Sequence, residues 1–322
     1  MGLFDENAVY PYMLKYNIWY MTIAMLETIL TELRHELLTR SPLDALPPGV
    51  WRRTGALNTW GTNAIEGNTL TRKDVERILL EGRSVSNRSL PDVLETIQHE
   101  RAFESLLRRR TDPIRLSSVL DLHDTVFGGI KPDAGQWRRV NVRIAGVRHV
   151  PPRMEKVVAL MSDWEESYAK QDMAGAGVFP LGARMHFEFE SIHPFSDGNG
   201  RVGRLLLNLH FLKHNWPPVH ILPPDRSRYL GSLNASHTGD LPGLEAFLTA
   251  AMGRSLLDLL DQVGTTEDEL KPLRKMAARG PYSAKYLGLR AGQERLPAIQ
   301  IAGDWHTSDR ALRVYRQRVG RE

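Results

Sequence analysis

The 322-residue sequence predicts a mainly α-helical fold with one small β-hairpin and a small, basic C-terminal domain. Apolar residues recur every three or four positions over most of the chain, which is the period of a helix. In the body of the chain, Val140–Ile144 alternates apolar with polar residues, as a half-buried strand does. Residues 271–322 contain 12 Lys and Arg against 4 Asp and Glu, whereas the other 270 residues contain 30 against 34.

The composition is that of a soluble globular protein, with 42% hydrophobic and 25% charged residues. Cysteine is absent, which excludes disulfides, thiolate metal ligands and a cysteine nucleophile, and we expect a cytoplasmic location. Asp5 and Glu6 stand where a signal peptide would be basic. The longest apolar run, Ile18–Leu26, is too short to span a bilayer, so no membrane contact is expected.

Ten helices are expected ahead of the C-terminal region, and helix-breaking or helix-capping residues mark some of their ends. The first spans residues 15–39 and ends where Pro and Gly gather between positions 42 and 49. Thr71 is expected to cap the start of a later helix. Further helices are expected over residues 51–65, 71–81, 91–110, 117–126, 153–170, 182–192, 201–214, 225–237 and 241–263.

A hairpin is expected between these helices. Val140–Ile144 forms its first strand, Ala145 and Gly146 turn the chain, and Val147–Val150 returns. Pro151 and the proline after it end the second strand.

The segment His193-Pro-Phe-Ser-Asp-Gly-Asn-Gly-Arg-Val-Gly-Arg204 lies between two expected helices and collects groups suited to nucleotide chemistry. Gly198–Gly200 opens a helix, where free backbone N–H groups can point at an anion. Arg201 and Arg204 are spaced i, i+3, so both lie on one side of that helix and can hold successive phosphates.

Two further residues complete this constellation. Asp197 is a hard oxygen ligand suited to Mg²⁺ that already carries phosphates and waters. His193 is the residue in the segment that can act as a base near neutral pH. Each part alone is more often a surface histidine, a turn or a solvated arginine. Together they predict phosphoryl or nucleotidyl transfer, in which positioning and charge neutralisation lower the barrier.

The segment resembles the signature motif of the Fic family, His-Pro-Phe-x-Asp-Gly-Asn-Gly-Arg-x-x-Arg, at every fixed position. The resemblance implies a Fic-type helical bundle that transfers AMP from ATP to a Ser, Thr or Tyr hydroxyl of a protein. It implies that His193 is the base and that Asp197 holds Mg²⁺. It also implies that the nest of Gly198, Asn199 and Gly200 binds the phosphates, and that Arg201 and Arg204 hold the β and γ phosphates.

The resemblance leaves alternatives open. Gly200 favours AMP transfer, because a phosphotransferase branch of the family carries Lys there. Removal of AMP, transfer of another nucleotide or phosphate group, and a DNA-binding regulator whose Fic body senses nucleotide all remain alternatives. The intact His193 favours an enzyme, since a sensor needs no base.

Two neighbouring stretches extend the resemblance. Gly135–Arg138 and the hairpin after it resemble the family's flap, whose edge aligns a target protein by strand addition; an ordinary hairpin is the alternative. The flap tip, at Ile144, Ala145 and Gly146, is expected beside the nucleotide. Tyr229 and His237 belong to a stretch that resembles the helix lining the nucleoside pocket, although relatives often have Asn in place of His237.

The stretch from Thr62 to Asn68 resembles the inhibitory motif [Ser/Thr]-x-x-x-Glu-[Gly/Asn] of a Fic subgroup with an N-terminal inhibitory helix. The carboxylate of Glu66 is expected to form a bidentate ion pair with Arg204 and to occupy the arginine meant for the γ-phosphate. The alternative is a solvated glutamate at a helix end.

The C-terminal region is expected to contain helices over residues 267–279 and 283–295, a hairpin over 296–308 and a helix over 309–318. This pattern resembles a winged helix-turn-helix of the excisionase or MerR kind. The helix with Lys285, Arg290 and Arg295 then faces DNA, while a protein-docking module is the alternative.

Four regions are therefore expected along the chain: an N-terminal helical region (1–110) with the inhibitory helix, a Fic catalytic core (111–255), a linker helix (256–270) and the C-terminal domain (271–322). The expected partners are a protein substrate on the flap, the chain itself through auto-modification or a homodimer, and DNA. The sequence does not identify the target protein or the modified residue type.

Overall fold

The computed structural model describes residues 6–144 and 148–319, with side chains in the first helix described from Ile23 onward. Helices dominate both stretches, as the sequence predicts, and one small sheet accompanies them. No helix in these two stretches combines the length and apolar character needed to cross a membrane.

The chain divides into two compact units. The central unit is Leu43–Ser255, and the terminal unit joins Met1–Pro42 to Leu256–Glu322. The expected N-terminal region, residues 1–110, is therefore shared between the two units. The reason is a long-range contact, because the first helix of the chain packs against the last one.

The described part of the central unit contains helices and no strand. Short 3₁₀ turns lie at Leu43–Ala45, Met154–Lys156 and Pro223–Asp225. The α-helices are α2 (Pro48–Ile65), α3 (Arg72–Leu79), α4 (Leu90–Arg109), α5 (Leu116–Phe127), α6 (Val157–Met173), α7 (Val178–Ile192), α8 (Asn199–Lys213), α9 (Arg226–Ser236) and α10 (Leu241–Val263), which continues into the terminal unit.

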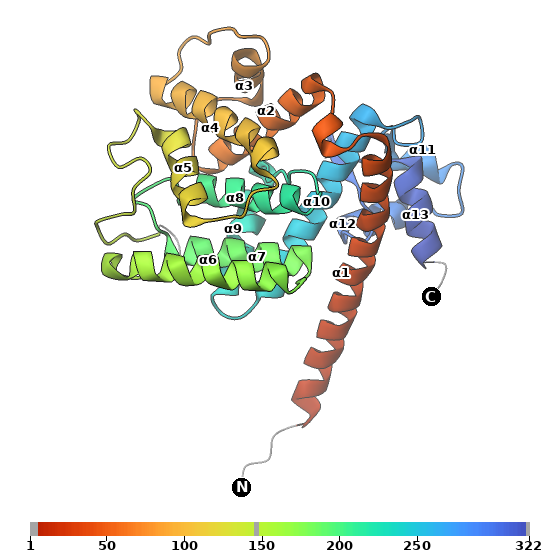
Figure 1. Cartoon of the computed structure of the whole chain (residues 1–322). Helices are drawn as coiled ribbons and strands as arrows, with labels where there is room; N and C mark the ends of the chain where they lie inside the picture. The colour runs from red at the N-terminus through yellow and green to blue at the C-terminus, as the bar shows by residue number, and fades with distance from the viewer. Residues whose placement is uncertain (1–5, 145–147, 320–322) are drawn as a thin grey trace. The chain divides into compact units, whose positions relative to one another are not determined.

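Helix α8 forms the centre of this unit, and Figure 1 shows it between α4 and α7. Leu205, Leu206, Leu207 and Leu209 are all at most 1% exposed, although they point to different sides of the helix. A helix that is buried on several sides must be surrounded by other helices. The surrounding helices therefore hold the start of α8, which carries the site, in one position.

Local signals predict most helix boundaries to within a few residues. Thr71 caps α3 as expected, since its hydroxyl accepts the Asp74 N–H while the Asp74 carboxylate accepts the Thr71 N–H. Such a capping box satisfies two otherwise free backbone donors.

The hairpin expected within residues 139–152 is wrong for the described residues, because neither 139–144 nor 148–152 forms a strand. Val140 and Val150 are 55% and 65% exposed, so neither packs on a core. An isolated two-stranded hairpin is marginal without a packed face, so alternation alone does not produce a ladder. Instead, the Arg138 guanidinium donates to the carbonyls of Val140 and Pro152, at 2.9 and 2.5 Å.

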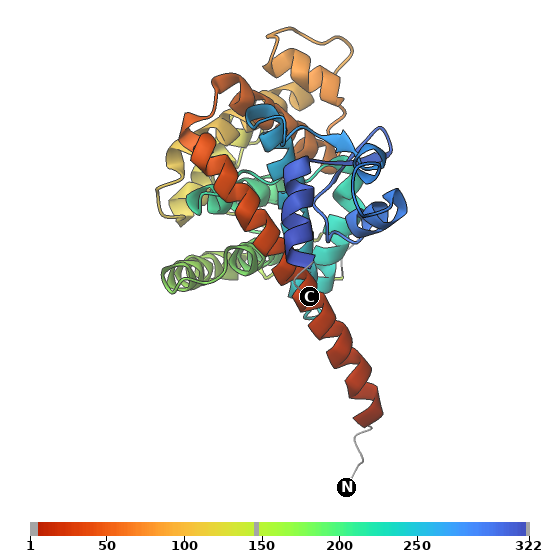
Figure 2. The same ribbon diagram turned by 90° about the vertical axis from the view of Figure 1, so that its right-hand side faces the viewer.

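The terminal unit combines α1 (Glu6–Arg40) with the C-terminal elements. Figure 2 shows α1 and α13 (Asp309–Val319) side by side. A three-stranded antiparallel sheet has the order β1-β3-β2, and its strands are β1 (Lys271–Pro272), β2 (Ile299–Ile301) and β3 (Asp304–Thr307). The predicted C-terminal hairpin is thus confirmed. Ala302 and Gly303 turn it with φ of 50° and 86°, as a tight hairpin turn requires.

The helix expected over residues 267–279 is wrong in its first half. Lys271–Pro272 pairs with β3 instead, and the helix α11 (Leu273–Ala277) begins after the proline. Proline has no N–H to donate but fits the residue before a first helical turn. The next helix, α12 (Ala284–Gly292), is capped by Ser283, whose hydroxyl accepts the Tyr286 N–H.

A buried ion cluster joins three parts of the terminal unit. Arg310 of α13 is 4% exposed and donates to the Asp268 carboxylate at 2.6 Å. Its guanidinium also lies 3.0 Å from the Glu36 carboxylate of α1. Asp268 is 1% exposed, so Arg310 neutralises a carboxylate that water hardly reaches.

Candidate active site

Two residues with a left-handed backbone conformation determine the course of the loop between α7 and α8. His193 has φ 52° and ψ 61° where α7 ends, and Gly198 has φ 83° where α8 begins. Asn199 holds the loop between them, because its side-chain amide accepts the Phe195 N–H at 2.8 Å and donates to the Phe195 carbonyl at 3.0 Å. Phe195 is fully buried, which anchors the loop in the core.

Glycine is required at position 198 for two reasons. Its φ is positive, and a Cβ there would collide with the Phe127 ring. The close approach of α5 thus fixes where the first turn of α8 lies.

His193 is arranged as a neutral base. Its Nδ1 lies 3.3 Å from the Glu190 carbonyl, which can only accept, so Nδ1 carries the proton and Nε2 keeps the lone pair. Burial lowers the pKa of His193, and the hydrogen bond to Glu190 only partly opposes this. The imidazole is therefore neutral near pH 7 and can accept a proton at Nε2.

Arg138 holds the backbone around His193. Its Nε donates to the His193 carbonyl at 2.8 Å, and its own N–H donates to the Pro194 carbonyl at 2.9 Å. Arg138 is 3% exposed, so these bonds are shielded from water. They stabilise the left-handed conformation that a histidine rarely adopts.

The start of α8 is the segment that the sequence predicts to bind an anion. No side chain caps its first turn, where backbone N–H groups have no partner inside the helix. Gly198, Asn199 and Gly200 begin this turn. The Gly198 N–H donates to the Asp197 carboxylate, and the Asn199 side chain is engaged with Phe195, so it does not cap the turn. The helix dipole adds positive potential at the same point.

Arg204 is held by α2. Its Nη2 lies 2.6 Å from the Glu66 carboxylate, and its Nε donates to the Thr62 hydroxyl at 2.6 Å. Burial opposes ionisation of Glu66, but the charge and hydrogen bond of Arg204 outweigh it and lower the pKa of Glu66. The structure thus brings together Thr62, Glu66 and Arg204, which lie far apart in the sequence.

Arg201 is engaged by different groups. It forms ion pairs with Glu95 of α4 and, at 3.4 Å, with Asp197, and its guanidinium lies 4.6 Å from the centre of the Phe127 ring. Sequence reasoning missed Glu95, because nothing local marks a helix-surface glutamate as a partner of Arg201.

Asp197 lies at the edge of the site with its side chain 53% exposed. One oxygen accepts the Gly198 N–H at 2.6 Å, and the other lies 2.6 Å from the Lys131 ammonium. Burial opposes its ionisation, but the Lys131 hydrogen bond and the Arg201 charge lower the pKa of Asp197. Lys131 is a second residue that the sequence did not reveal.

The described residues contain no cluster of three metal-binding side chains, so within them no closed metal cage exists. Mg²⁺ does not need one, since it keeps waters and binds through one or two carboxylates plus substrate phosphates. An ionised, accessible Asp197 beside the anion site fits that donor set.

The residues expected to line the nucleoside pocket lie in different surroundings. Tyr229 is 1% exposed, and its hydroxyl lies 2.7 Å from His186 Nε2, so its ring belongs to the core and is not open to a ligand. An aromatic on a helix face packs inward when its hydroxyl finds a buried partner. His237 ends α9, and its ring stacks on His149 at 4.0 Å and 12°. Ile144 is half-buried.

The other two flap-tip residues, Ala145 and Gly146, lie outside the described residues.

Glu190 is a further residue that sequence reasoning missed. One carboxyl oxygen lies 4.0 Å from His193 Nδ1, and the other is buried with no hydrogen-bond partner in the described part of the chain. Burial raises the pKa of Glu190 to about 8. A mostly protonated carboxyl therefore lies behind the base at neutral pH.

Residues 113–211 match the Fic/DOC family. This match includes the whole segment from His193 to Arg204 and the α5 to α8 elements that position it. Among curated relatives, protein adenylyltransferase fic-1 of Caenorhabditis elegans is 30% identical over 224 residues, which are 68% of this chain and 44% of the relative. Protein adenylyltransferase Fic of Nematostella vectensis is 30% identical over 199 residues, 61% of this chain and 46% of the relative. The chain thus spans less than half the length of these relatives.

Solved Fic structures share the architecture. Fic-1 (residues 134–508 of that protein) from C. elegans superimposes with a TM-score of 0.68 and 26% identity, covering 80% of this chain and 77% of that one. A Fic domain containing signaling protein from Bacteroides thetaiotaomicron gives a TM-score of 0.62 at 25% identity, covering 74% and 97%. These likenesses identify the mainly helical architecture as the Fic fold.

Proposed function

We propose that this chain transfers AMP from Mg·ATP to a hydroxyl group of a protein. One observation carries the proposal: a neutral His193 with a free Nε2 stands at the open N-terminus of α8, which also bears Arg201 and Arg204. The names of the relatives, protein adenylyltransferases, support the same activity.

The reaction follows from these positions. Nε2 of His193 takes the proton of the target hydroxyl, and the hydroxyl oxygen forms a bond to the α-phosphorus. The bond from the α-phosphorus to the bridging oxygen breaks, and pyrophosphate leaves with that electron pair. The N–H groups of Gly198–Gly200 and the two arginines neutralise the phosphates. Asp197 would hold Mg²⁺, which supplies further charge neutralisation when bound.

We further propose that the Glu66–Arg204 ion pair restrains this activity. The pair lies 2.6 Å apart and occupies the arginine that would otherwise bind the γ-phosphate. A triphosphate also brings negative charge towards the Glu66 carboxylate, so the two compete. The same carboxylate could activate water for removal of AMP, which makes hydrolytic reversal the second activity to test.

The flap segment, residues 139–152, is proposed to receive the target protein. Its described residues form no ladder. Arg138 engages the Val140 and Pro152 carbonyls, and the backbone groups between them would take part in strand addition. Auto-modification, a homodimer and a DNA contact of residues 271–322 complete the proposed partners. The order helix, helix, hairpin, helix in α11, α12, β2–β3 and α13 supports the last of these.

The test uses ATP labelled at the α-phosphate, with host lysate as the target source. We expect Glu66→Gly to incorporate more label than the wild type and His193→Ala added to it to incorporate none. Glu81→Gly, an exposed glutamate outside the site, is the matched control and should behave like the wild type. Equal labelling by the Glu66→Gly protein with and without His193 would sink the proposal.

The transferred group is tested separately. Label at the γ-phosphate should not be incorporated, and α-labelled GTP, CTP and UTP should label targets less than ATP. Incorporation from the γ-position would instead identify a phosphotransferase.

A further inference from the structure

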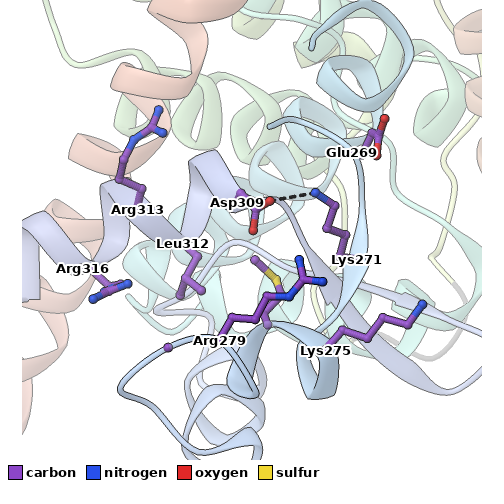
Figure 3. A pocket seen from close by; sticks show the side chains of 10 residues that line it. Glu269, Lys271, Lys275, Arg279, Asp309, Leu312, Arg313 and Arg316 are labelled. Carbon is purple, nitrogen blue, oxygen red and sulfur yellow. Dashed lines mark hydrogen bonds and ion pairs between the residues drawn. The ribbon is translucent and has the colours of Figure 1, made fainter. Parts of the chain in front are cut away.

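A cavity of about 450 Å³ opens in the terminal unit between α11 and α13. Five of its lining residues are basic: Lys271, Lys275, Arg279, Arg313 and Arg316. Figure 3 shows them on two walls, with Lys275 and Arg279 facing Leu312 and Arg316 of α13. Only two acidic residues, Glu269 and Asp309, join them, so the cavity has an excess of positive charge.

Internal ion pairs use only part of this charge. Lys271 pairs with Asp309 at 2.7 Å, and Arg313 forms a two-bond pair with Glu267 at 2.9 and 3.0 Å. For Lys275, Arg279 and Arg316, no carboxylate of the described residues lies within ion-pair distance. Three exposed cations thus remain available along one groove.

The groove continues into a hollow of about 360 Å³ that shares Arg313 and Arg316 and adds Tyr282. The Tyr282 ring stacks on Tyr286, with centroids 4.8 Å apart and planes at 20°, which fixes its orientation. The Arg316 guanidinium lies 5.9 Å from the centre of the Tyr282 ring. The row of cations therefore ends at the Tyr282 ring, whose orientation Tyr286 fixes.

The available charges suit a polymer rather than a small anion. A pocket for one small anion brings buried donors to one point, whereas Lys275, Arg279 and Arg316 are exposed and spread along the groove. Successive phosphates of a nucleic acid can each meet one cation and release counterions. An unpaired base can stack on an aromatic face such as Tyr282, whereas polyglutamate has no aromatic group that could do so.

We propose that this groove binds nucleic acid through its phosphodiester groups, with Tyr282 as the stacking surface for an unpaired base. This deepens the proposed DNA contact of residues 271–322, but it moves the contact away from α12. On α12, the Arg290 side chain is engaged by Gln293 at 2.9 Å and lies over the Tyr286 ring, which leaves Lys285 as the exposed cation of that helix. The inference does not depend on AMP transfer.

The experiment measures fluorescence anisotropy of a labelled single strand of about 20 nucleotides, the matching duplex and a polyglutamate peptide, using the full chain. The groove variant carries Lys275→Ala, Arg279→Ala and Arg316→Ala. We expect it to bind both nucleic acids at least about ten-fold more weakly and with a shallower salt dependence. The matched control, Lys73→Ala, Arg83→Ala and Arg108→Ala, removes the same exposed charge from the central unit and should bind like the wild type.

Further variants separate the sources of affinity. Tyr282→Ala should weaken the single strand about ten-fold and leave the duplex unchanged. Arg279→Lys keeps the charge and should retain binding, which distinguishes a lost phosphate contact from a misfolded groove. Auto-modification by the groove variant should match that of the parent, so failure of this proposal is distinguishable from failure of AMP transfer.

Three outcomes would overturn the proposal: nucleic acid binding unchanged in the groove variant, equal weakening in the control variant, or polyglutamate binding as tight as that of the single strand. Loss of binding in Lys285→Ala alone would return the contact to α12.

Discussion

The Glu66 carboxylate lies 2.6 Å from the Arg204 guanidinium, and it reaches this position across the Cα of Gly200. A Cβ at position 200 would collide with the Glu66 oxygen. The Thr62 hydroxyl, one turn earlier on α2, accepts from Arg204 Nε at 2.6 Å. Gly200 therefore leaves room for the Glu66 carboxylate at the start of α8, the segment proposed to bind the phosphates.

The restraint should respond to charge in a graded way. Glu66→Gln keeps the shape and one hydrogen bond but removes the ion pair, whereas Glu66→Gly removes both. We expect label incorporation from α-labelled ATP to rise in the order wild type, Glu66→Gln, Glu66→Gly. If Arg204 is free of Glu66 in one wild-type molecule in ten, the total increase should be about ten-fold. The apparent ATP affinity should rise in the same order, which calorimetry can measure. Equal activity of the Gln variant and the wild type would show that charge is not what excludes the triphosphate.

The pH dependence should follow the buried histidine. Burial lowers the pKa of His193, and the active form is the neutral one. The imidazole therefore loses its proton below the usual pH 6.5, and activity should rise with pH only in the acid range and then level off. The measurement is kcat/KM of the Glu66→Gly variant from pH 5 to 8. A rise centred well above pH 6.5 would contradict this environment for His193.

A candidate site can be proposed from the sequence alone where its residues are contiguous. His193, Asp197 and Gly198 belong to the loop before α8 and Arg201 to its first turn, so their proposed roles need no knowledge of the fold. The Glu66–Arg204 contact could be expected because a motif resemblance marked its distant partner. Tyr229 shows the limit of that method, since helical position alone does not say whether a ring lines a pocket or fills the core.

The residues that escaped prediction act over long sequence distances. Arg138 binds the His193 carbonyl, and Lys131 binds Asp197, although more than 50 residues, including α6 and α7, separate the partners in the sequence. No local pattern reveals such contacts, because each depends on how α5 and the segment after it pack against α8. The same reason explains why α1 joins the terminal unit and why Lys271–Pro272 becomes a strand.

A buried carboxyl should make stability depend on pH. Burial raises the pKa of Glu100 to about 7, so the folded state holds a proton that the unfolded state releases near the ordinary glutamate pKa of 4.5. The resulting stabilisation is complete below pH 4.5 and is lost as the pH rises through 7. The Glu100→Gln variant should therefore melt at the same temperature as the wild type near pH 5 and at a higher temperature near pH 8. The gain in the free energy of unfolding at pH 8 should be at most about 3 kcal/mol. Thr59 can still donate to the amide oxygen, as it now does to the carboxylate at 2.9 Å. Parallel melting curves across this range would contradict the raised pKa.

The terminal unit should depend on its buried arginine. Arg310→Met leaves the buried Asp268 carboxylate with only Arg40 of the described cations, 3.9 Å away, and removing one partner of a buried ion pair costs at most about 3–5 kcal/mol. Chemical denaturation should show the loss, and hydrogen exchange should locate it in α13 and the end of α1. Arg313→Met is the matched control, because its pair with Glu267 is exposed to solvent and contributes little to stability. Adding Asp268→Asn to Arg310→Met should recover part of the stability, since the amide oxygen still accepts the Thr265 N–H and no charge remains buried. If Arg310→Met and Arg313→Met destabilise equally, the cluster does not hold α13 in place.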